Sequence, residues 1–124
     1  MRSLALPLLA AALLAACGSE TPAATTQTDL LVRVDQDGPH GAQPPRAARV
    51  RCPGAHCSAT RGLSPRDFAP TPKNVACNMI YGGPETATVK GTLRGKPVDA
   101  RFSRTDGCQT NRWRKVQRLL AAAS

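Results

Sequence analysis

Residues 86–102, TATVKGTLRGKPVDARF, decide the fold of this chain. Polar and apolar residues alternate on both sides of a central turn, with the two-residue period of strands that have one buried face. The turn, Arg94-Gly95-Lys96, is centred on a glycine, so the stretch predicts a β-hairpin. Pro97 must lie at a strand start or on a sheet edge, because it has no N–H for the ladder. The predicted buried face consists of Ala87, Val89, Leu93, Val98, Ala100 and Phe102.

Two further strands are predicted before the hairpin. Residues 30–35 (LLVRVD) and 48–52 (ARVRC) are β-rich and partly alternating, and Gly38-Pro39 stops the first. We expect them to pair antiparallel across the loop between them. Residues 58–63 predict a short helical segment before Pro65, with Phe68 as its anchor in the core.

The C-terminal segment predicts an amphipathic helix from Asn111 onward, with Thr110 or Asn111 as its cap. Its apolar residues recur at helical spacing, and its basic residues cover the other side. A basic helix with a tryptophan also suits a membrane surface, but packing on the hairpin is favoured because a small domain needs the buried area. The apolar positions are Trp113, Val116, Leu119 and Leu120, and the basic ones are Arg112, Arg114, Lys115 and Arg118.

The N-terminus has the features of an export signal. Residues 1–16 combine Arg2 with an apolar run too short to span a bilayer, and they end in Leu-Ala-Ala before Cys17. Small residues before a cysteine resemble the bacterial lipobox, in which Cys17 is acylated. An ordinary secretory peptide that leaves Cys17 free is the alternative. We therefore expect a signal peptide over 1–16, a flexible tether over 17–28 and a folded domain over 29–124, held outside the cytoplasm by a lipid anchor.

Cysteine usage agrees with an oxidising compartment. Without Cys17, four cysteines remain at positions 52, 57, 77 and 108, so two disulfides are expected. A zinc site that uses His40 and His56 is the competing use. It is disfavoured because Cys52 and Cys57 have no second close-spaced Cys or His pair. We expect no metal and no cofactor.

Charge and composition limit the function classes. The formal net charge is +9, which favours acidic partners or anionic envelope polymers, although a solvated basic surface without a specific partner is the preferred interpretation. Nucleic acid is not expected, because aromatic residues are only 3% of the chain and cannot form a base-stacking platform. An enzyme is not expected either, since two histidines and oxidised cysteines leave no nucleophile and base pair. No catalytic residues are assigned.

Residues 76–84, ACNMIYGGP, form an unusual loop candidate. A half-cystine is followed after one residue by an apolar Met-Ile-Tyr run and then by a Gly-Gly-Pro turn. Such a segment exposes large side chains on a loop that something else must hold rigid. The alternative is that Met79 and Ile80 are core residues of a strand leading into the hairpin.

Three motifs together resemble the subtilisin inhibitor-like family of bacterial secreted protease inhibitors. They are CNMIY at 77–81, TATVKGTLRGKPV at 86–98 and FSRTDGC at 102–108. The similarity extends over residues 74–113 and is looser over 29–57. The resemblance implies an α+β two-layer fold, with an antiparallel sheet of about five strands covered by one or two short helices. It also implies a fold that commonly forms homodimers through the sheet.

The resemblance implies disulfides Cys77–Cys108 and Cys52–Cys57, and a reactive-site bond between Met79 and Ile80. The protease-binding loop then comprises Cys77, Asn78, Met79, Ile80 and Tyr81. In the family a longer segment usually separates the first two half-cystines and helps to brace the loop, whereas four residues separate them here. The family's C-terminal end is typically a short strand, where this chain has the segment around Trp113.

The expected function is therefore a lipid-anchored, extracytoplasmic bacterial inhibitor of subtilisin-like or chymotrypsin-like serine proteases. An extended loop lies in the protease groove by strand addition, and Met79 fills an apolar pocket. The alternative is an envelope lipoprotein of the same fold that does not inhibit proteases and uses its basic surface on anionic polymers.

Overall fold

The computed structural model describes residue 18 and residues 27–124. The predicted signal peptide, Cys17 and most of the predicted tether lie outside the described residues. The described chain forms one antiparallel sheet, one α-helix and two disulfides, which is an α+β fold. The expectation of about five strands is wrong: the sheet has four, because the C-terminal segment forms a helix and adds no strand.

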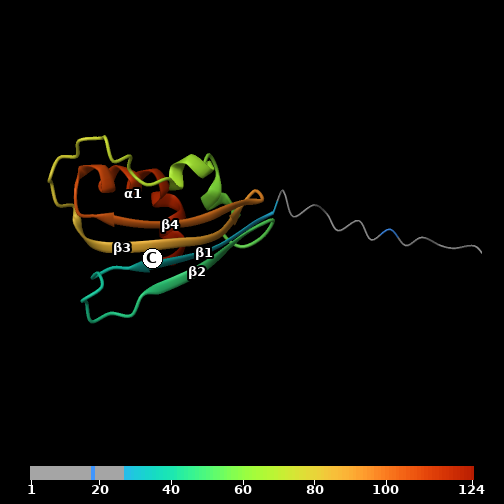
Figure 1. Ribbon diagram of the computed structural model, residues 1–124. Helices are drawn as coiled ribbons and strands as arrows, with labels where there is room; N and C mark the ends of the chain where they lie inside the picture. The colour runs from blue at the N-terminus through green and yellow to red at the C-terminus, as the bar shows by residue number, and fades with distance from the viewer. Residues whose placement is uncertain (1–17, 19–26) are drawn as a thin grey trace, which may run out of the picture.

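The sheet has the strand order β2-β1-β3-β4 (Figure 1). β1 (Thr28–Asp35) pairs antiparallel with β2 (Arg46–Cys52) on one side and with β3 (Gly83–Leu93) on the other. β4 (Lys96–Arg104) is the outer neighbour of β3. The two predicted N-terminal strands and their antiparallel pairing are confirmed.

The predicted β3–β4 hairpin is also confirmed. Arg94 and Gly95 form its turn with φ of 47° and 79°, and positive φ at both central residues matches the right-handed twist of the strands. The six residues predicted for the inner face are all buried. Pro97 is the second residue of an edge strand, where its missing N–H costs no ladder bond.

The C-terminal helix α1 (Gly107–Leu120) begins one turn earlier than expected and continues into the short 3₁₀ helix η3 (Ala121–Ala123). Thr110 and Asn111 are not its cap. The cap is Asp106, whose carboxylate accepts a hydrogen bond from the Gln109 N–H at 2.9 Å. An aspartate followed three residues later by Gln109 is the pattern of a capping box, so the sequence carried this signal.

Two 3₁₀ helices, η1 (Cys57–Thr60) and η2 (Pro65–Phe68), replace the short helix expected over residues 58–63. Phe68 is the predicted core anchor: it is 6% exposed, and its ring meets that of Phe102 edge to face at 6.3 Å. The short helices and α1 cover the same face of the sheet (Figure 1). None of the described helices is long and apolar enough to cross a membrane.

The core lies between this helical layer and the inner face of the sheet. Its largest completely buried side chains come from β1, β2 and β3 and from the last two turns of α1. The apolar stripe of the helix therefore packs on the sheet, as expected, and Trp113 packs against the same core while half-buried. The fully buried side chains are Leu30, Leu93, Leu119, Leu120, Val32, Val50, Val89 and Val116.

Leu119→Ala is expected to destabilise the domain by about 2–5 kcal/mol, because it removes a completely buried side chain and leaves a cavity. The measurement is the free energy of unfolding from urea denaturation of the oxidised protein. Leu31→Ala is the matched control: Leu31 is 42% exposed on the open face of the sheet, so the loss is expected to stay below about 1 kcal/mol. Equal losses would contradict the assigned core.

Candidate reactive-site loop

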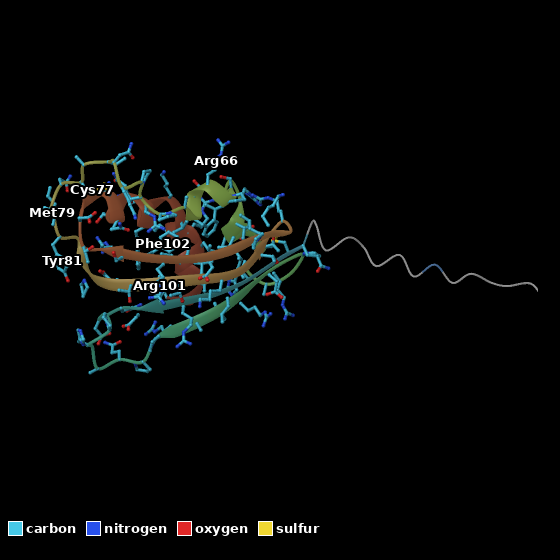
Figure 2. The ribbon with its side chains drawn as sticks, viewed as in Figure 1. Arg66, Cys77, Met79, Tyr81, Arg101 and Phe102 are labelled. Atoms are coloured by element: carbon cyan, nitrogen blue, oxygen red, sulfur yellow. A yellow bond between two sulfur atoms is a disulfide. The ribbon has the colours of Figure 1, made fainter. Side chains whose placement is uncertain are left out.

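Residues 76–82 connect the η2 region to β3 without forming a helix or a strand. Met79, Ile80 and Tyr81 are 83%, 69% and 63% exposed, and Figure 2 shows Met79 and Tyr81 at the outer end of the molecule. The structure therefore excludes the alternative in which Met79 and Ile80 are core residues. A run of three large apolar side chains at this exposure is typical of a surface that binds a partner.

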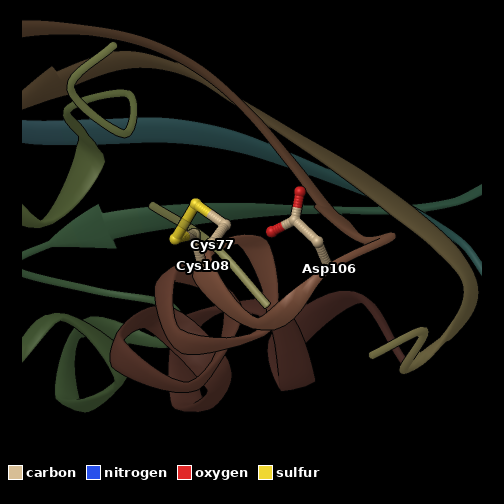
Figure 3. Close-up of side chains that lie close together, drawn as sticks. All are labelled: Cys77, Asp106 and Cys108. Carbon is tan, nitrogen blue, oxygen red and sulfur yellow. A yellow bond between two sulfur atoms is a disulfide. The ribbon is translucent and has the colours of Figure 1, made fainter. Parts of the chain in front are cut away.

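A disulfide holds the first flank of the loop. Cys77 is bonded to Cys108 in the first turn of α1, with the Cα atoms 5.4 Å apart (Figure 3). One residue later, the carbonyl of Asn78 accepts a hydrogen bond from the Gly107 N–H at 3.0 Å. The segment before Met79 is thus fixed, covalently and by backbone hydrogen bonding, to the start of the helix.

The second flank is held by the last residue of β4. The Gly82 N–H donates to the Arg104 carbonyl at 2.6 Å. A Cβ on Gly82 would lie 3.2 Å from that carbonyl oxygen and 2.8 Å from the hydroxyl oxygen of Thr110, so the approach is tight. The Arg104 guanidinium also pairs with Glu85 at 2.9 Å, with both side chains half-buried.

Asn78 bridges the two flanks through its side chain. Its Oδ1 accepts a hydrogen bond from the Ile80 N–H at 3.3 Å, so it spans the peptide bond between Met79 and Ile80. The amide packs closely on the helix start, because a Cβ on Gly107 would lie 2.2 Å from Asn78 Oδ1. A glycine at position 107 is therefore required for this arrangement of Asn78.

Arg112 fixes the segment that leads into the loop. Its guanidinium donates to the backbone carbonyls of Ala69 (2.9 Å), Arg101 (2.9 Å) and Phe68 (3.3 Å). The same group lies over the Phe102 ring, 4.7 Å from its centroid. Burial lowers the pKa of Arg112, but an arginine pKa is normally so high that the group stays charged at neutral pH.

The Cys52–Cys57 disulfide is formed as expected, but it lies at the other end of the sheet. Cys52 is opposite Thr28 at the start of β1, whereas the candidate loop joins β3 beside the end of β1, where Asp35 is opposite Thr86. The short Cys52–Cys57 segment therefore does not brace the loop directly. That role falls to residues 104–108 and to Arg112.

Cys77, Cys108 and Asp106 place three metal-ligand atoms within 4.8 Å of one another (Figure 3). The two sulfur atoms are bonded to each other, so neither is a thiolate, which is the form that binds metals. The Asp106 carboxylate caps the helix. The disulfide and the helix cap at the start of α1 explain why these groups lie close together.

Sequence reasoning predicted the exposed residues and their disulfide but not their polar supports. Arg112 was assigned to the solvated side of the helix, and no sequence signal identifies it, because its carbonyl partners at 68 and 69 are more than 40 positions away. Arg104 likewise acts through its backbone carbonyl, which every residue possesses.

Comparisons with protein-family models, with curated proteins and with solved structures found no match to this chain.

Removal of the Cys77–Cys108 disulfide by the double change Cys77→Ser and Cys108→Ser is expected to cost about 3–4 kcal/mol, because it releases a loop of 31 residues. Cys52→Ser with Cys57→Ser is the matched control, which opens a five-residue separation and should cost about 2 kcal/mol. Unfolding free energies and limited proteolysis measure both. Cleavage within 76–82 should rise only in the first variant. An equal rise in the second would contradict the conclusion that the Cys77–Cys108 disulfide holds the loop.

Proposed function

We propose that this protein is an inhibitor of subtilisin-like serine proteases that binds as a substrate through residues 77–81, with Met79–Ile80 as the reactive-site bond. The observation that carries the proposal is the anchoring of both flanks of this bond to the same short segment. Cys77 and Asn78 on one side, and Gly82 on the other, are all held by residues 104–108.

The exposed loop suits the way proteases bind substrates. The segment lies outside the sheet, so backbone groups other than the Asn78 carbonyl and the Ile80 N–H, which are hydrogen-bonded within the domain, can pair with the edge of a protease groove. Met79 is the most exposed of the large apolar residues that the structure describes, and its flexible thioether adapts to a broad apolar pocket. This chemistry favours subtilisin-like or chymotrypsin-like enzymes over enzymes whose pocket selects a basic residue.

The anchors supply a reason for slow net cleavage. When the protease serine attacks the Met79 carbonyl, the bond to Ile80 breaks, Met79 becomes the acyl group and the Ile80 nitrogen leaves as an amine. Cys77 and Asn78 hold the acyl side, while Gly82 holds the amine side. Asn78 Oδ1 keeps a hydrogen-bond acceptor at the Ile80 nitrogen. The high effective concentration of this amine favours religation over hydrolysis.

A rigid loop also binds more tightly. Because the disulfide and the hydrogen bonds order the loop before binding, less conformational entropy is lost in the complex. Exposed apolar side chains presented in this way can act as the few residues that dominate an interface.

We further propose that the domain is tethered outside the cytoplasm through acylated Cys17. The two disulfides are compatible with such an oxidising location. The chain enters the domain at Thr28, and the Gln27 carbonyl accepts a hydrogen bond from Gly95 in the β3–β4 turn, so the attachment point lies at the end of the sheet opposite the loop. Figure 1 shows this separation, which would leave the loop accessible beyond a membrane anchor.

Met79→Asp is expected to weaken inhibition of subtilisin by about 1,000-fold, because a charged carboxylate would replace an apolar side chain in the pocket. The measurement is a titration of subtilisin activity with residues 27–124, which contain the whole described core. Leu31→Asp is the matched control, since it introduces the same charge at an exposed apolar position on the open face of the sheet. Absence of inhibition by the parent domain, or undiminished inhibition by Met79→Asp, would overturn the proposal.

Asn78→Ala is expected to leave initial binding within about tenfold of the parent but to make inhibition temporary. The change removes the acceptor at the Ile80 nitrogen and leaves the backbone anchor to Gly107 in place. Mass spectrometry of the complex over time should show faster accumulation of chains cut between Met79 and Ile80. Asn78→Asp keeps an acceptor oxygen and serves as the control. Equal cleavage rates in the parent and Asn78→Ala would show that the side chain has no such role.

A further inference from the structure

A basic groove lies on the helical side of the molecule, between η1 and the exposed face of α1. Its volume is about 490 Å³, and the four cationic side chains that line it are Arg61, Arg114, Lys115 and Arg118. Arg61 follows η1 directly, whereas the other three lie on α1, so cations come from both walls. No acidic residue of the described chain lines this groove.

The charges of the groove are not neutralised within the domain. In the part of the chain that the structure describes, none of the four cations forms a salt bridge. On the open face of the sheet, by contrast, two arginines are paired with a carboxylate. Asp29 pairs there with Arg49 at 2.7 Å and with Arg51 at 3.6 Å, and the hydrogen bond from Arg49 lowers the pKa of Asp29.

The clustering works against helix stability. Arg114 and Arg118 are four residues apart on one helix face, and Lys115 and Arg118 are three apart, so like charges are neighbours. Such pairs destabilise a helix, although Arg118 in the last turn interacts favourably with the helix dipole. An anion bound between these cations would attract each of them and so offset their mutual repulsion.

The wall of the groove that follows η1 lies near the N-terminal attachment point. Leu63 in this wall accepts a hydrogen bond from the Arg94 guanidinium, and the Arg94 N–H donates to the hydroxyl oxygen of Thr28 at 3.0 Å. Arg114 is shared, because it also lines a smaller pocket behind the loop with Asn78 and Ile80. Arg61, Lys115 and Arg118 line the groove but not the pocket behind the loop, so these three residues are the ones changed to test the groove.

We infer that this groove is a binding site for phosphate-bearing anions. Guanidinium groups match phosphate oxygens with two parallel N–H donors, and the lysine ammonium adds a compact charge. Cations on two facing walls can contact one phosphate group from both sides, or successive phosphates of a chain. The site does not depend on the proposed inhibition, because its three diagnostic residues lie outside the loop and its anchors.

The test measures binding of two probes to the full-length chain carrying Cys17→Ser, which has no thiol at position 17 for acylation. Inorganic tripolyphosphate is titrated by calorimetry. Vesicles of phosphatidylcholine, with and without phosphatidylglycerol, are tested by cosedimentation, and the vesicles without phosphatidylglycerol supply the baseline. Binding to tripolyphosphate assigns a free phosphate ligand, and binding only to vesicles with phosphatidylglycerol assigns a lipid headgroup.

The triple variant Arg61→Gln, Lys115→Gln and Arg118→Gln is expected to bind about 100-fold more weakly, because each cation near an anionic surface contributes about a fivefold factor in affinity. The matched control, Arg33→Gln, Lys90→Gln and Arg101→Gln, removes the same net charge from exposed positions on the open face of the sheet. It is expected to change affinity by less than about threefold at physiological salt, where distant charges are screened.

Equal weakening by the two triple variants would overturn the site, because the protein would then bind through its net charge alone. Absence of binding to both probes would overturn it as well. Thermal unfolding checks that both variants are folded. If the triple variant is unstable, Arg118→Gln alone is tested instead, and its affinity is expected to fall about fivefold. Unchanged inhibition of subtilisin by the groove variant would separate this site from the loop.

Discussion

The bond between Cys77 and Cys108 is the constraint on which the exposed end of the molecule depends. It joins a segment without regular structure to the first turn of α1, whose position is set by burial of Val116, Leu119 and Leu120 against the sheet. The rigidity of the core therefore extends to Met79. Without this bond, three exposed apolar side chains would lie on a chain free to collapse onto the surface.

Hydrogen bonds hold the loop in place together with the disulfide. Before the Met79–Ile80 bond, the Asn78 carbonyl accepts a hydrogen bond from the Gly107 N–H, and after it the Gly82 N–H donates to the Arg104 carbonyl. The Asn78 side chain spans the bond by accepting from the Ile80 N–H. Arg112 extends the support to the segment before the loop by binding the carbonyls of Phe68 and Ala69. Hydrogen bonds from a charged donor are stronger than neutral ones, so a single half-buried arginine can order a segment that has few apolar contacts.

The two ends of the domain differ in chemistry. The candidate loop presents apolar side chains beside the strand-to-helix corner, while the groove beside η1 gathers cations that the described chain leaves without carboxylate partners. The chain leaves towards its N-terminus at the end of the sheet opposite the loop. A tethered domain with this polarity would hold anionic groups near its attachment and present the loop to partners in solution.

The sequence alone determined the hairpin, the first two strands, the anchor Phe68 and the amphipathic C-terminal helix, because alternation and helical periodicity record which side of a local element is buried. It also carried the Asp106 and Gln109 capping signal. Only the tertiary structure decided that the sheet has four strands, that Cys52–Cys57 lies far from the loop, and that Arg112 and Arg104 support it. These features depend on contacts between residues distant in sequence, often through backbone atoms that are the same in every residue, so no local pattern encodes them.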